Sequence, residues 1–327
     1  MSERLPPIDA VLLLSFGGPE GPDDVMPFLE NVTRGRGIPR ERLREVEQRY
    51  LRFGGVSPLN AHCRELRAAL EAALRRSGPD LPVYWGNRNW HPMLADTMAR
   101  MAADGIRRAV AVATAAYSSY SACRQYLEDI ERARAAVGAG APLVEKLPPY
   151  YNHPAFIDTM AARTRDAAAR LGPAGSGARL VFTAHSIPVA MAAACDYEAE
   201  LREAAALVAD RAAAGGVPWD LVYQSRSGPP GQPWLEPDVC DHLRALAAAG
   251  VDTAVLVPIG FVADHMEVLY DLDTEARAVA DALGIRIERA RTVGAAPSFV
   301  GGLRELIADH VAGRTPRALG TRGPRPS

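Results

Sequence analysis

Two groups of side chains in this sequence could handle a metal ion or protons. His185 directly follows the apolar run Leu180–Ala184, and imidazole titrates near neutrality and binds transition metals. Glu267, Asp271 and Glu275 follow one another at steps of four, which aligns their carboxylates along one helix face. A solvated helix face is the ordinary explanation of such a line. A histidine facing it would instead make a path for a divalent cation or for protons.

A second set of residues suits a ligand that carries carboxylates. Arg34, Arg49 and Tyr50 precede the loop 54–58, in which Ser57 adds a hydroxyl. Guanidinium groups bind carboxylates through paired hydrogen bonds, and hydroxyls add single ones. An exposed arginine cluster without a ligand is the alternative, and these residues alone leave both open.

The glycines after the first apolar run bear on nucleotide binding. Phe16 is followed by Gly17 and Gly18, but the spacing GxGxxG is missing there and GxxxxGK[ST] occurs nowhere in the chain. The pattern therefore disfavours a dinucleotide or ATP as the ligand. A tight turn and direct ligand contact are both open for these glycines.

Short apolar runs alternate with amphipathic stretches along the chain, which is typical of βαβ units and parallel sheets. Because ligands bind at the carboxyl ends of parallel strands, the residues after these runs should meet at one rim. The expected strands are Ala10–Ser15, Val83–Trp85, Ala109–Ala113, Leu143–Lys146, Leu180–Ala184, Leu221–Gln224, Ala254–Val257 and Arg286–Glu288. The expected helices include Asn60–Arg75, Met93–Ala103, Ala122–Val137, Phe156–Leu171, Tyr197–Ala214 and Met266–Leu283.

Length and composition narrow the class of protein. The 327 residues fit about two domains of ~150 residues each. With 48% hydrophobic and 23% charged residues, the chain is neither disordered nor fibrous. The 37 basic and 39 acidic side chains nearly balance, so nucleic acid is not an expected partner. No signal-peptide pattern or membrane-length apolar run is present, and we expect a cytoplasmic protein without stable membrane association.

The cysteines give no indication of a metal site or a disulfide framework. Cys63, Cys123, Cys195 and Cys240 are widely spaced and form no CxxC pair. We expect all of them to be free thiols, in keeping with a reducing compartment.

Taken together, these segments resemble the ferrochelatase family, and most closely its coproporphyrin branch in actinobacteria and other Gram-positive bacteria. The resemblance extends over about residues 8–312, and its blocks occur in the family's order. The blocks are Leu14–Pro19, Arg49–Tyr50 with Gly54–Leu59, Ala184–Pro188, Gln224–Arg226 with Pro233–Asp238, and Val257–Asp271.

The resemblance implies an α/β fold of the class II chelatase type, with two Rossmann-like domains and a porphyrin cleft between them. Each domain would hold a parallel sheet flanked by helices. The first domain would comprise residues 1–117 and 295–312, with a carboxy-terminal helix at about Ser298–Val311 that crosses back to it. The second would comprise residues 118–294 and carry the catalytic histidine. A disordered tail, 313–327, and a monomeric state are also expected.

The implied reaction is the insertion of Fe²⁺ into coproporphyrin III, which yields coproheme in haem biosynthesis. His185 matches the family's active-site histidine and Glu267 its partner carboxylate, so these two are the expected catalytic pair. The expected metal-handling residues are His185, Glu267, Asp271 and Glu275. The expected porphyrin-binding residues are Phe16, Arg34, Arg49, Tyr50, Ser57, Tyr117, Tyr120, Tyr126 and Trp234.

Two departures from the family pattern bear on iron. Many relatives have tyrosine where this chain has Phe16, so no phenol oxygen is available there as a ligand. Several relatives bind a two-iron, two-sulfur cluster through cysteines in the carboxy-terminal tail and one upstream. Here both the tail and the region around Asp158 and Thr159 lack cysteine. We therefore expect Fe²⁺ as a substrate, no iron–sulfur cluster, and no tightly bound cofactor. A transient contact with the next enzyme of haem synthesis is also expected.

Two other functions stay open at this point. One is a chelatase that takes protoporphyrin IX or another tetrapyrrole. The other is a carrier that binds haem or porphyrin without turnover. A carrier needs the arginines and apolar walls, but it does not need a histidine opposite a carboxylate.

Overall fold

The computed structural model of the chain describes residues 7–119, 124–213, 216–228 and 231–320. They form two parallel four-stranded sheets whose strand orders, β2-β1-β3-β4 and β6-β5-β7-β8, repeat the same topology. In each sheet the chain leaves its first strand to one side and later returns to the other, which places a switch point beside β1 and another beside β5. The strands are β1 Ala10–Ser15, β2 Val83–Asn87, β3 Arg108–Ala113, β4 Leu143–Lys146, β5 Arg179–His185, β6 Trp219–Gln224, β7 Thr253–Val257 and β8 Arg286–Arg289.

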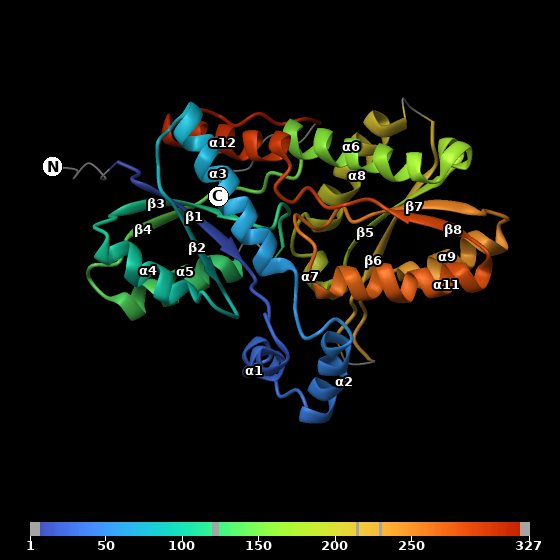
Figure 1. Cartoon of the computed structure of the whole chain (residues 1–327), viewed down its shortest axis with the longest axis horizontal. Coiled ribbons are helices and arrows are strands. Elements are labelled where there is room, and N and C mark those ends of the chain that lie inside the picture. Colours follow the sequence, from blue (N-terminus) through green and yellow to red (C-terminus); the bar gives the residue numbers. More distant parts are fainter. Residues whose placement is uncertain (1–6, 120–123, 214–215, 229–230, 321–327) are drawn as a thin grey trace.

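Helices cover both faces of the two sheets, which lie next to each other (Figure 1). In that view α3, α12, α6 and α8 lie above the sheets, and α4, α5, α9 and α11 lie below. The helices are α1 Pro22–Val32, α2 Arg40–Leu51, α3 Leu59–Ser77, α4 Leu94–Ala103, α5 Gln125–Val137, α6 Pro154–Arg170, η2 Gly172–Gly177, α7 Val189–Ala192, α8 Tyr197–Ala213, α9 Val239–Ala248, α10 Met266–Val268, η3 Leu269–Ala276, α11 Arg277–Leu283 and α12 Pro297–Val311.

One continuous hydrophobic core joins the two halves on the face covered by α3, α6, α8 and α12. It includes Leu13 from the first sheet, Phe182 from the second, and Phe156 and Phe299 from α6 and α12. On the opposite face each sheet has a core of its own, because alternate strand residues point to opposite faces. The halves are therefore joined along one face, and α12 packs on α3 of the first half and on α6.

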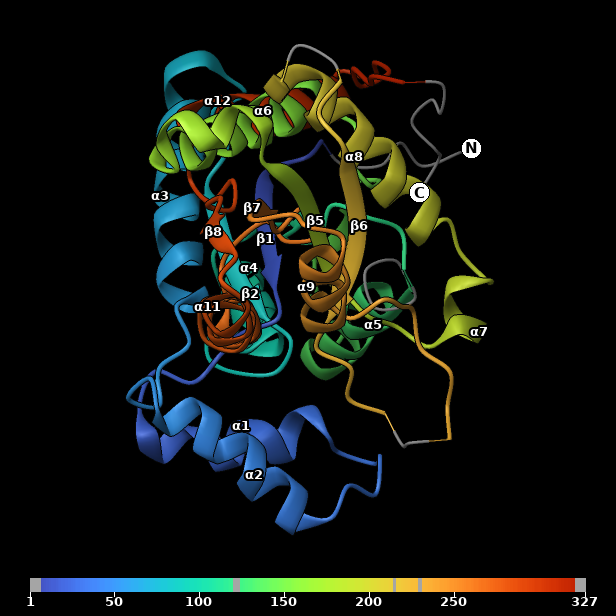
Figure 2. The same cartoon turned by 90° about the vertical axis from the view of Figure 1, so that its right-hand side faces the viewer.

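The helices α1 and α2 project from the junction of the two halves (Figures 1 and 2). A small core holds them together through Phe28, Leu43 and Tyr50, and Met266 of the second half belongs to the same core. This contact places the amino-terminal helices against the start of α10, although more than two hundred residues separate them in the chain.

Two expected boundaries need correction. The strand Leu143–Lys146, expected in the second domain, pairs with β3 and belongs to the first sheet. The preceding helix α5 packs on α4 and on the first sheet's own core, because the β3–α5–β4 crossover continues that sheet.

The tail is also ordered farther than expected: the main chain of Leu319 donates to and accepts from Asn152, both at 2.9 Å. Residues 321–327 lie outside the described part.

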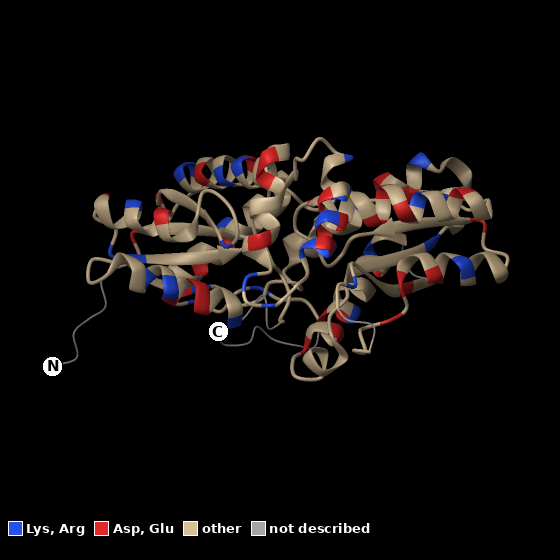
Figure 3. Cartoon of the chain, turned by 90° about the horizontal axis from the view of Figure 1, so that it is seen from below, with Lys and Arg blue, Asp and Glu red and all other residues tan. Residues whose placement is uncertain are grey.

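Basic and acidic residues are both spread along the helices of the ribbon in Figure 3. This distribution follows from the near balance of 37 basic and 39 acidic residues. Within the described part of the chain, no helix is long and apolar enough to cross a membrane.

Two neighbouring glycines of α12 test its close crossing with α6. A Cβ on Gly301 would meet nothing within 4 Å, whereas one on Gly302 would lie 2.3 Å from the Cβ of Ala155. We predict that Gly301→Ala raises the free energy of unfolding by about 0.5–1 kcal/mol, since alanine favours a helix interior. Gly302→Ala should lower it by about 1–3 kcal/mol through overpacking. Urea denaturation of both variants measures the difference, and equal effects would contradict this crossing.

Candidate active site

His185 is held at the carboxyl end of β5 by two hydrogen bonds. Its Nδ1 lies 2.5 Å from the carbonyl oxygen of Ser186, and its own carbonyl oxygen accepts from the Tyr197 hydroxyl at 3.0 Å. A carbonyl oxygen only accepts, so Nδ1 carries a proton in this arrangement. In the neutral imidazole, Nε2 is then the nitrogen with a free lone pair.

A second segment fixes the loop that follows His185. The Ser186 hydroxyl donates to the carbonyl of Leu235, and the Leu235 amide donates to the carbonyl of Ile187. Trp234, a predicted porphyrin residue, is half-buried in this short antiparallel pairing and forms a bridge with Pro188. Its position makes Trp234 a support of the histidine loop.

Glu267 faces His185 from the helix that follows β7. The imidazole Nε2 and a carboxylate oxygen of Glu267 are 3.5 Å apart, and both side chains are partly exposed, by 33% and 46%. The imidazole Nδ1 of His265 accepts from the Glu267 amide at 3.2 Å and caps the helix start. Burial, the largest effect, lowers the pKa of His265, so this cap is a neutral imidazole.

The geometry of the facing pair would allow it to share a cation. With Nδ1 of His185 protonated, Nε2 and the Glu267 oxygen are both acceptors, and two lone pairs at this distance repel each other. A proton on Nε2 or a metal ion near the two atoms removes the repulsion. Imidazole nitrogen and carboxylate oxygen are both ligands of Fe²⁺ in proteins.

Asp271 lies deeper, on the next turn of the same helix. It is only 6% exposed. The Ser225 hydroxyl donates to Asp271, and the Gln224 side chain donates to it at 3.3 Å and to the main-chain carbonyl of Glu267 at 3.4 Å. Burial, together with the charge of Glu267, raises the pKa of Asp271 to about 7. This carboxyl can therefore take up or release a proton near neutrality.

Ser225 reaches Asp271 from a strained backbone. It directly follows β6 and is the one non-glycine residue in the described part with a positive φ, at 64°. Such a conformation costs a β-carbon-bearing residue of order 1 kcal/mol and is concentrated at functional sites. Here it points a hydroxyl at a buried carboxyl.

The three carboxylates lie in a row along the helix and do not surround a common point. Glu267 begins the line in α10, and Asp271 and Glu275 follow it in η3, a π-helix. A π-helix has more residues per turn than an α-helix, so steps of four keep these residues on one side. Glu275 is exposed at the far end. Among the described residues, no three histidine, cysteine, aspartate or glutamate side chains converge on one position, so the predicted metal residues form no closed chelate.

The predicted residues on α2 lie against this helix. Tyr50 is buried in the core that includes Met266, and burial and then the charge of Glu267 raise the pKa of its phenol well above the usual value. The guanidinium of Arg49 lies 4.7 Å from the ring centre of Tyr270. Arg34 is exposed in the loop between α1 and α2.

Phe16, a predicted porphyrin-binding residue, directly follows β1 and is 39% exposed. Its ring packs edge-to-face against Phe28 at 6.2 Å, and the Arg88 guanidinium lies 5.9 Å from the ring centre. Gly17 follows with φ 85°, where a Cβ would come within 2.9 Å of Asn87. The tight-turn explanation therefore accounts for this glycine.

Other predicted porphyrin residues have structural surroundings. Tyr117 is 3% exposed, and its hydroxyl donates to the carbonyl of Ile259. Tyr126 is buried beside Arg88 in the first sheet's core. Ser57 is buried, and its Cβ is 2.6 Å from the position that a Cβ on Gly18 would take. Tyr117, Tyr126 and Ser57 are therefore buried in this structure, and their contact with a porphyrin stays a prediction. Tyr120 lies outside the described residues.

Several neighbours of the pair were not among the predicted site residues. His265, Gln224 and Ser225 all contact Glu267 or Asp271. Two signals in the sequence mark them: each lies at the carboxyl end of an apolar strand or in the loop after it, and each falls within the blocks Gln224–Arg226 or Val257–Asp271 that carry the family resemblance. Of the cysteines, Cys63 and Cys240 are free thiols, as predicted, the Cys195 thiol donates to the carbonyl of Met191 at 3.3 Å, and Cys123 lies outside the described residues.

A cavity of about 370 Å³ lies at the other end of the second sheet. Arg179, Pro218 and Trp219 line it, at the amino ends of β5 and β6. Ligand sites of such sheets lie at the carboxyl ends, so the candidate site is the rim around His185 and Glu267.

Two solved structures, CbiX and SirB, share this architecture. The structure of CbiX, described as the terminal enzyme for biosynthesis of siroheme in denitrifying bacteria, superposes with a TM-score of 0.52 over 91% of this chain and 98% of its own, at 16% identity. SirB from Bacillus subtilis gives 0.55 over 93% and 98%, at 12% identity. At these identities the similarity shows the fold alone: a two-domain chelatase fold, as expected.

Sequence comparisons identify the family. The ferrochelatase family model matches residues 8–311. The chain is 54% identical to a ferrochelatase of Rhodopirellula baltica over 99% of its length and 92% of that protein. It is 55% identical to a coproporphyrin III ferrochelatase of Nocardia farcinica, over 96% and 91%, and 52% identical to one of Streptomyces coelicolor, over 97% and 90%. The chain belongs to the ferrochelatase family.

The buried carboxyl predicts a pH-dependent stability. Because its folded pKa of about 7 exceeds the usual aspartate value, Asp271 holds its proton in the folded state after the unfolded chain has lost it. Its cost to stability is thus complete above about pH 7 and disappears as the pH falls towards 4. We predict that Asp271→Asn is more stable than the wild type near pH 8, and that this advantage shrinks on acidification.

Melting temperatures of both proteins from about pH 8 to pH 5 check this prediction. The exposed Glu275→Gln controls for the loss of one charge from the same helix. An Asp271→Asn advantage that stays constant over this range would contradict the raised pKa.

Proposed function

We propose that this protein inserts Fe²⁺ into coproporphyrin III to give coproheme, and that His185 and Glu267 are the residues at the point of insertion. The observation that carries the proposal is the 3.5 Å approach of the imidazole Nε2 to the Glu267 carboxylate. The ferrochelatase family model over residues 8–311 supports the reaction. The names of the relatives from Nocardia farcinica and Streptomyces coelicolor support the porphyrin.

The chemistry exchanges one cation for two protons. Fe²⁺ replaces the two inner N–H protons of the free-base porphyrin, so the net reaction releases two protons and forms four iron–nitrogen bonds. Nε2 of His185 and the Glu267 carboxylate can bind the ion as it loses water, and they repel each other once it has left. That repulsion is relieved when the pair takes up a proton from the ring, so metal release and proton uptake are coupled.

A second proton needs a second acceptor near neutrality. Asp271, whose pKa is raised to about 7 by burial and by Glu267, is suited to that step. From there the line leads to the exposed Glu275 and to solvent. In this mechanism the line carries protons outward, and its lack of a closed chelate favours release of the metal over storage.

Arginines on the amino-terminal helices suit the four propionates of coproporphyrin. Arg34 is exposed in the α1–α2 loop, and Arg49 lies over the Tyr270 ring. Phe16 after β1 and Val189 after the His185 loop leave large apolar surface exposed, which suits the faces of a macrocycle. Protoporphyrin, with two propionates, would use fewer of the charged contacts.

Further expectations belong to this proposal and stay predictions. They are a monomeric state, a cytoplasmic location, the absence of an iron–sulfur cluster, and a transient contact that passes coproheme to the next enzyme. Purified protein that is brown and contains acid-labile sulfide would contradict the prediction about the cluster.

Replacing the histidine separates catalysis from binding. We predict that His185→Ala lowers kcat by at least about a hundredfold, because it removes both the metal ligand and the proton acceptor. Porphyrin affinity should stay within about tenfold, or about 1.4 kcal/mol. Anaerobic absorbance assays with Fe²⁺ and equilibrium titration with coproporphyrin III measure the two quantities. His310→Ala, which removes only a contact between α12 and Glu145, is the control.

The same assays distinguish the alternatives. Wild-type turnover by His185→Ala would remove this residue from the mechanism. Tight binding of porphyrins without turnover by the unmodified protein would make it a carrier. Faster turnover of protoporphyrin IX than of coproporphyrin III would keep the chelatase and reject the argument from propionates.

We expect the two arginines to favour coproporphyrin III over protoporphyrin IX. Arg34→Ala and Arg49→Ala should each raise the KM for coproporphyrin III about three- to tenfold, as expected for a charged hydrogen bond of about 1 kcal/mol. The KM for protoporphyrin IX should change less. Arg42→Ala, which removes a contact with Glu45 on the surface of α2, is the control. Equal increases for both porphyrins would contradict a role in propionate recognition.

A further inference from the structure

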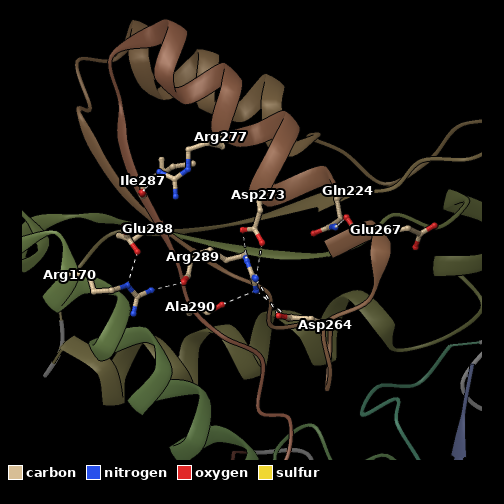
Figure 4. Close-up of polar contacts among 10 residues, drawn as sticks. All are labelled: Arg170, Gln224, Asp264, Glu267, Asp273, Arg277, Ile287, Glu288, Arg289 and Ala290. Atoms are coloured by element: carbon tan, nitrogen blue, oxygen red, sulfur yellow. Dashed lines mark hydrogen bonds and ion pairs between the residues drawn. The ribbon is translucent and has the colours of Figure 1, made fainter. Parts of the chain in front are cut away.

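Arg289 is the last residue of the edge strand β8, and its guanidinium forms hydrogen bonds with two acidic side chains (Figure 4). Its Nε and Nη2 donate to the two carboxylate oxygens of Asp273 at 2.7 and 2.8 Å. Its Nη1 and Nη2 donate to the two oxygens of Asp264 at 3.1 and 3.2 Å. A further bond from Nη1 reaches the carbonyl of Ala290 at 3.4 Å. Every N of the guanidinium thus donates, and both carboxylates are bound bidentately.

The two carboxylates flank the segment that carries the candidate site. Asp264 precedes Glu267 by three residues, in the loop after β7, and Asp273 lies in η3, two residues after Asp271. The guanidinium therefore ties the loop before Glu267 to the helix after it. The Arg289 side chain therefore holds the Glu267–Asp271 segment near both of its ends.

The environment makes this attachment strong. The side chains of Arg289 and Asp264 are 13% and 15% exposed, and that of Asp273 is 37% exposed. Hydrogen bonds between charged groups are stronger than neutral ones, and paired geometry adds direction. Without the guanidinium, the two carboxylates would face each other unpaired, and their repulsion would push the loop away from η3.

We propose that Arg289 is a positioning residue for metal insertion, which holds Glu267 at its distance from His185 by joining Asp264 to Asp273. The inference rests on the proposed function of the His185–Glu267 pair. A planar fork with five donors is required, because lysine offers one charge at a point and cannot bind two carboxylates bidentately.

The substitution Arg289→Met tests the inference. It should lower kcat for Fe²⁺ insertion by at least about tenfold, since a displacement near 1 Å at a reacting group costs up to about a hundredfold. The dissociation constant for coproporphyrin III should stay within about threefold, because the guanidinium of Arg289 binds Asp264 and Asp273 and is not an expected porphyrin contact. Arg289→Lys should show an intermediate loss of kcat.

Arg170→Met is the matched control. Arg170 also binds the end of β8, through Glu288 at 2.7 Å and through the carbonyl of Arg289 at 2.8 Å, but it does not touch Asp264 or Asp273 (Figure 4). Its kcat should stay within about twofold of the wild type. If Arg170→Met loses as much activity as Arg289→Met, anchoring of β8 in general explains the effect and the inference is overturned.

A double-mutant cycle separates positioning from loss of stability. If Arg289 acts through Glu267, then Arg289→Met should lower kcat little further in a Glu267→Gln background. Multiplicative losses would overturn the inference. Should Arg289→Met fail to fold, Asp273→Asn weakens one side of the fork, and the same cycle applies to it with the same expected outcome.

The two proposals fail in different ways. Wild-type kcat in Glu267→Gln alone would reject the site itself. A large loss in Glu267→Gln combined with wild-type kcat in Arg289→Met and Asp273→Asn would keep the site and reject the role of Arg289.

Discussion

Two acceptors that face each other, the His185 Nε2 and a Glu267 carboxylate oxygen 3.5 Å away, are the feature that the rest of the second half supports. Such an arrangement is unfavourable unless a proton or a metal ion is shared, so it persists only where its surroundings fix both groups. Ser186 fixes the histidine tautomer from one side. From the other, the His265 cap and the two ion pairs of Arg289 fix the helix. A shared proton or metal ion would therefore relieve the repulsion between the two groups.

The parallel topology explains why these groups meet. In the second sheet β5 lies between β6 and β7, so the residues that follow these three strands share one edge. His185 ends β5, Ser225 follows β6, and Glu267 begins the helix after β7. The first sheet repeats this topology, with Phe16 after β1. A continuous core on one face holds the two sheets together, and the packing of Met266 against α1 and α2 accompanies the approach of Arg49 to Tyr270 on the acidic helix.

Local strain and charge burial accompany the site. Ser225 has a positive φ, η3 is a π-helix, and Asp271 is buried with a pKa raised to about 7. Each of these costs folding free energy, and the three meet at one place, because Asp271 lies in η3 and the Ser225 hydroxyl donates to it. The large cores on both faces of the sheets supply the stability that allows such features to persist.

The sequence by itself determined the strands and the α/β class, because apolar periodicity is a local property of the chain, and its motif blocks carried the resemblance that implied the family and the His185 and Glu267 hypotheses. The tertiary structure decided which residues share an environment. Leu143–Lys146 joins the first sheet because hydrogen bonding between strands is not local. Tyr117 is buried because it packs in the core that joins the two halves, where its hydroxyl donates to a carbonyl more than a hundred residues away. Arg289, which no motif marks, acquires its position only when β8 and η3 pack side by side, since contacts between distant segments are set by packing and not by spacing along the chain.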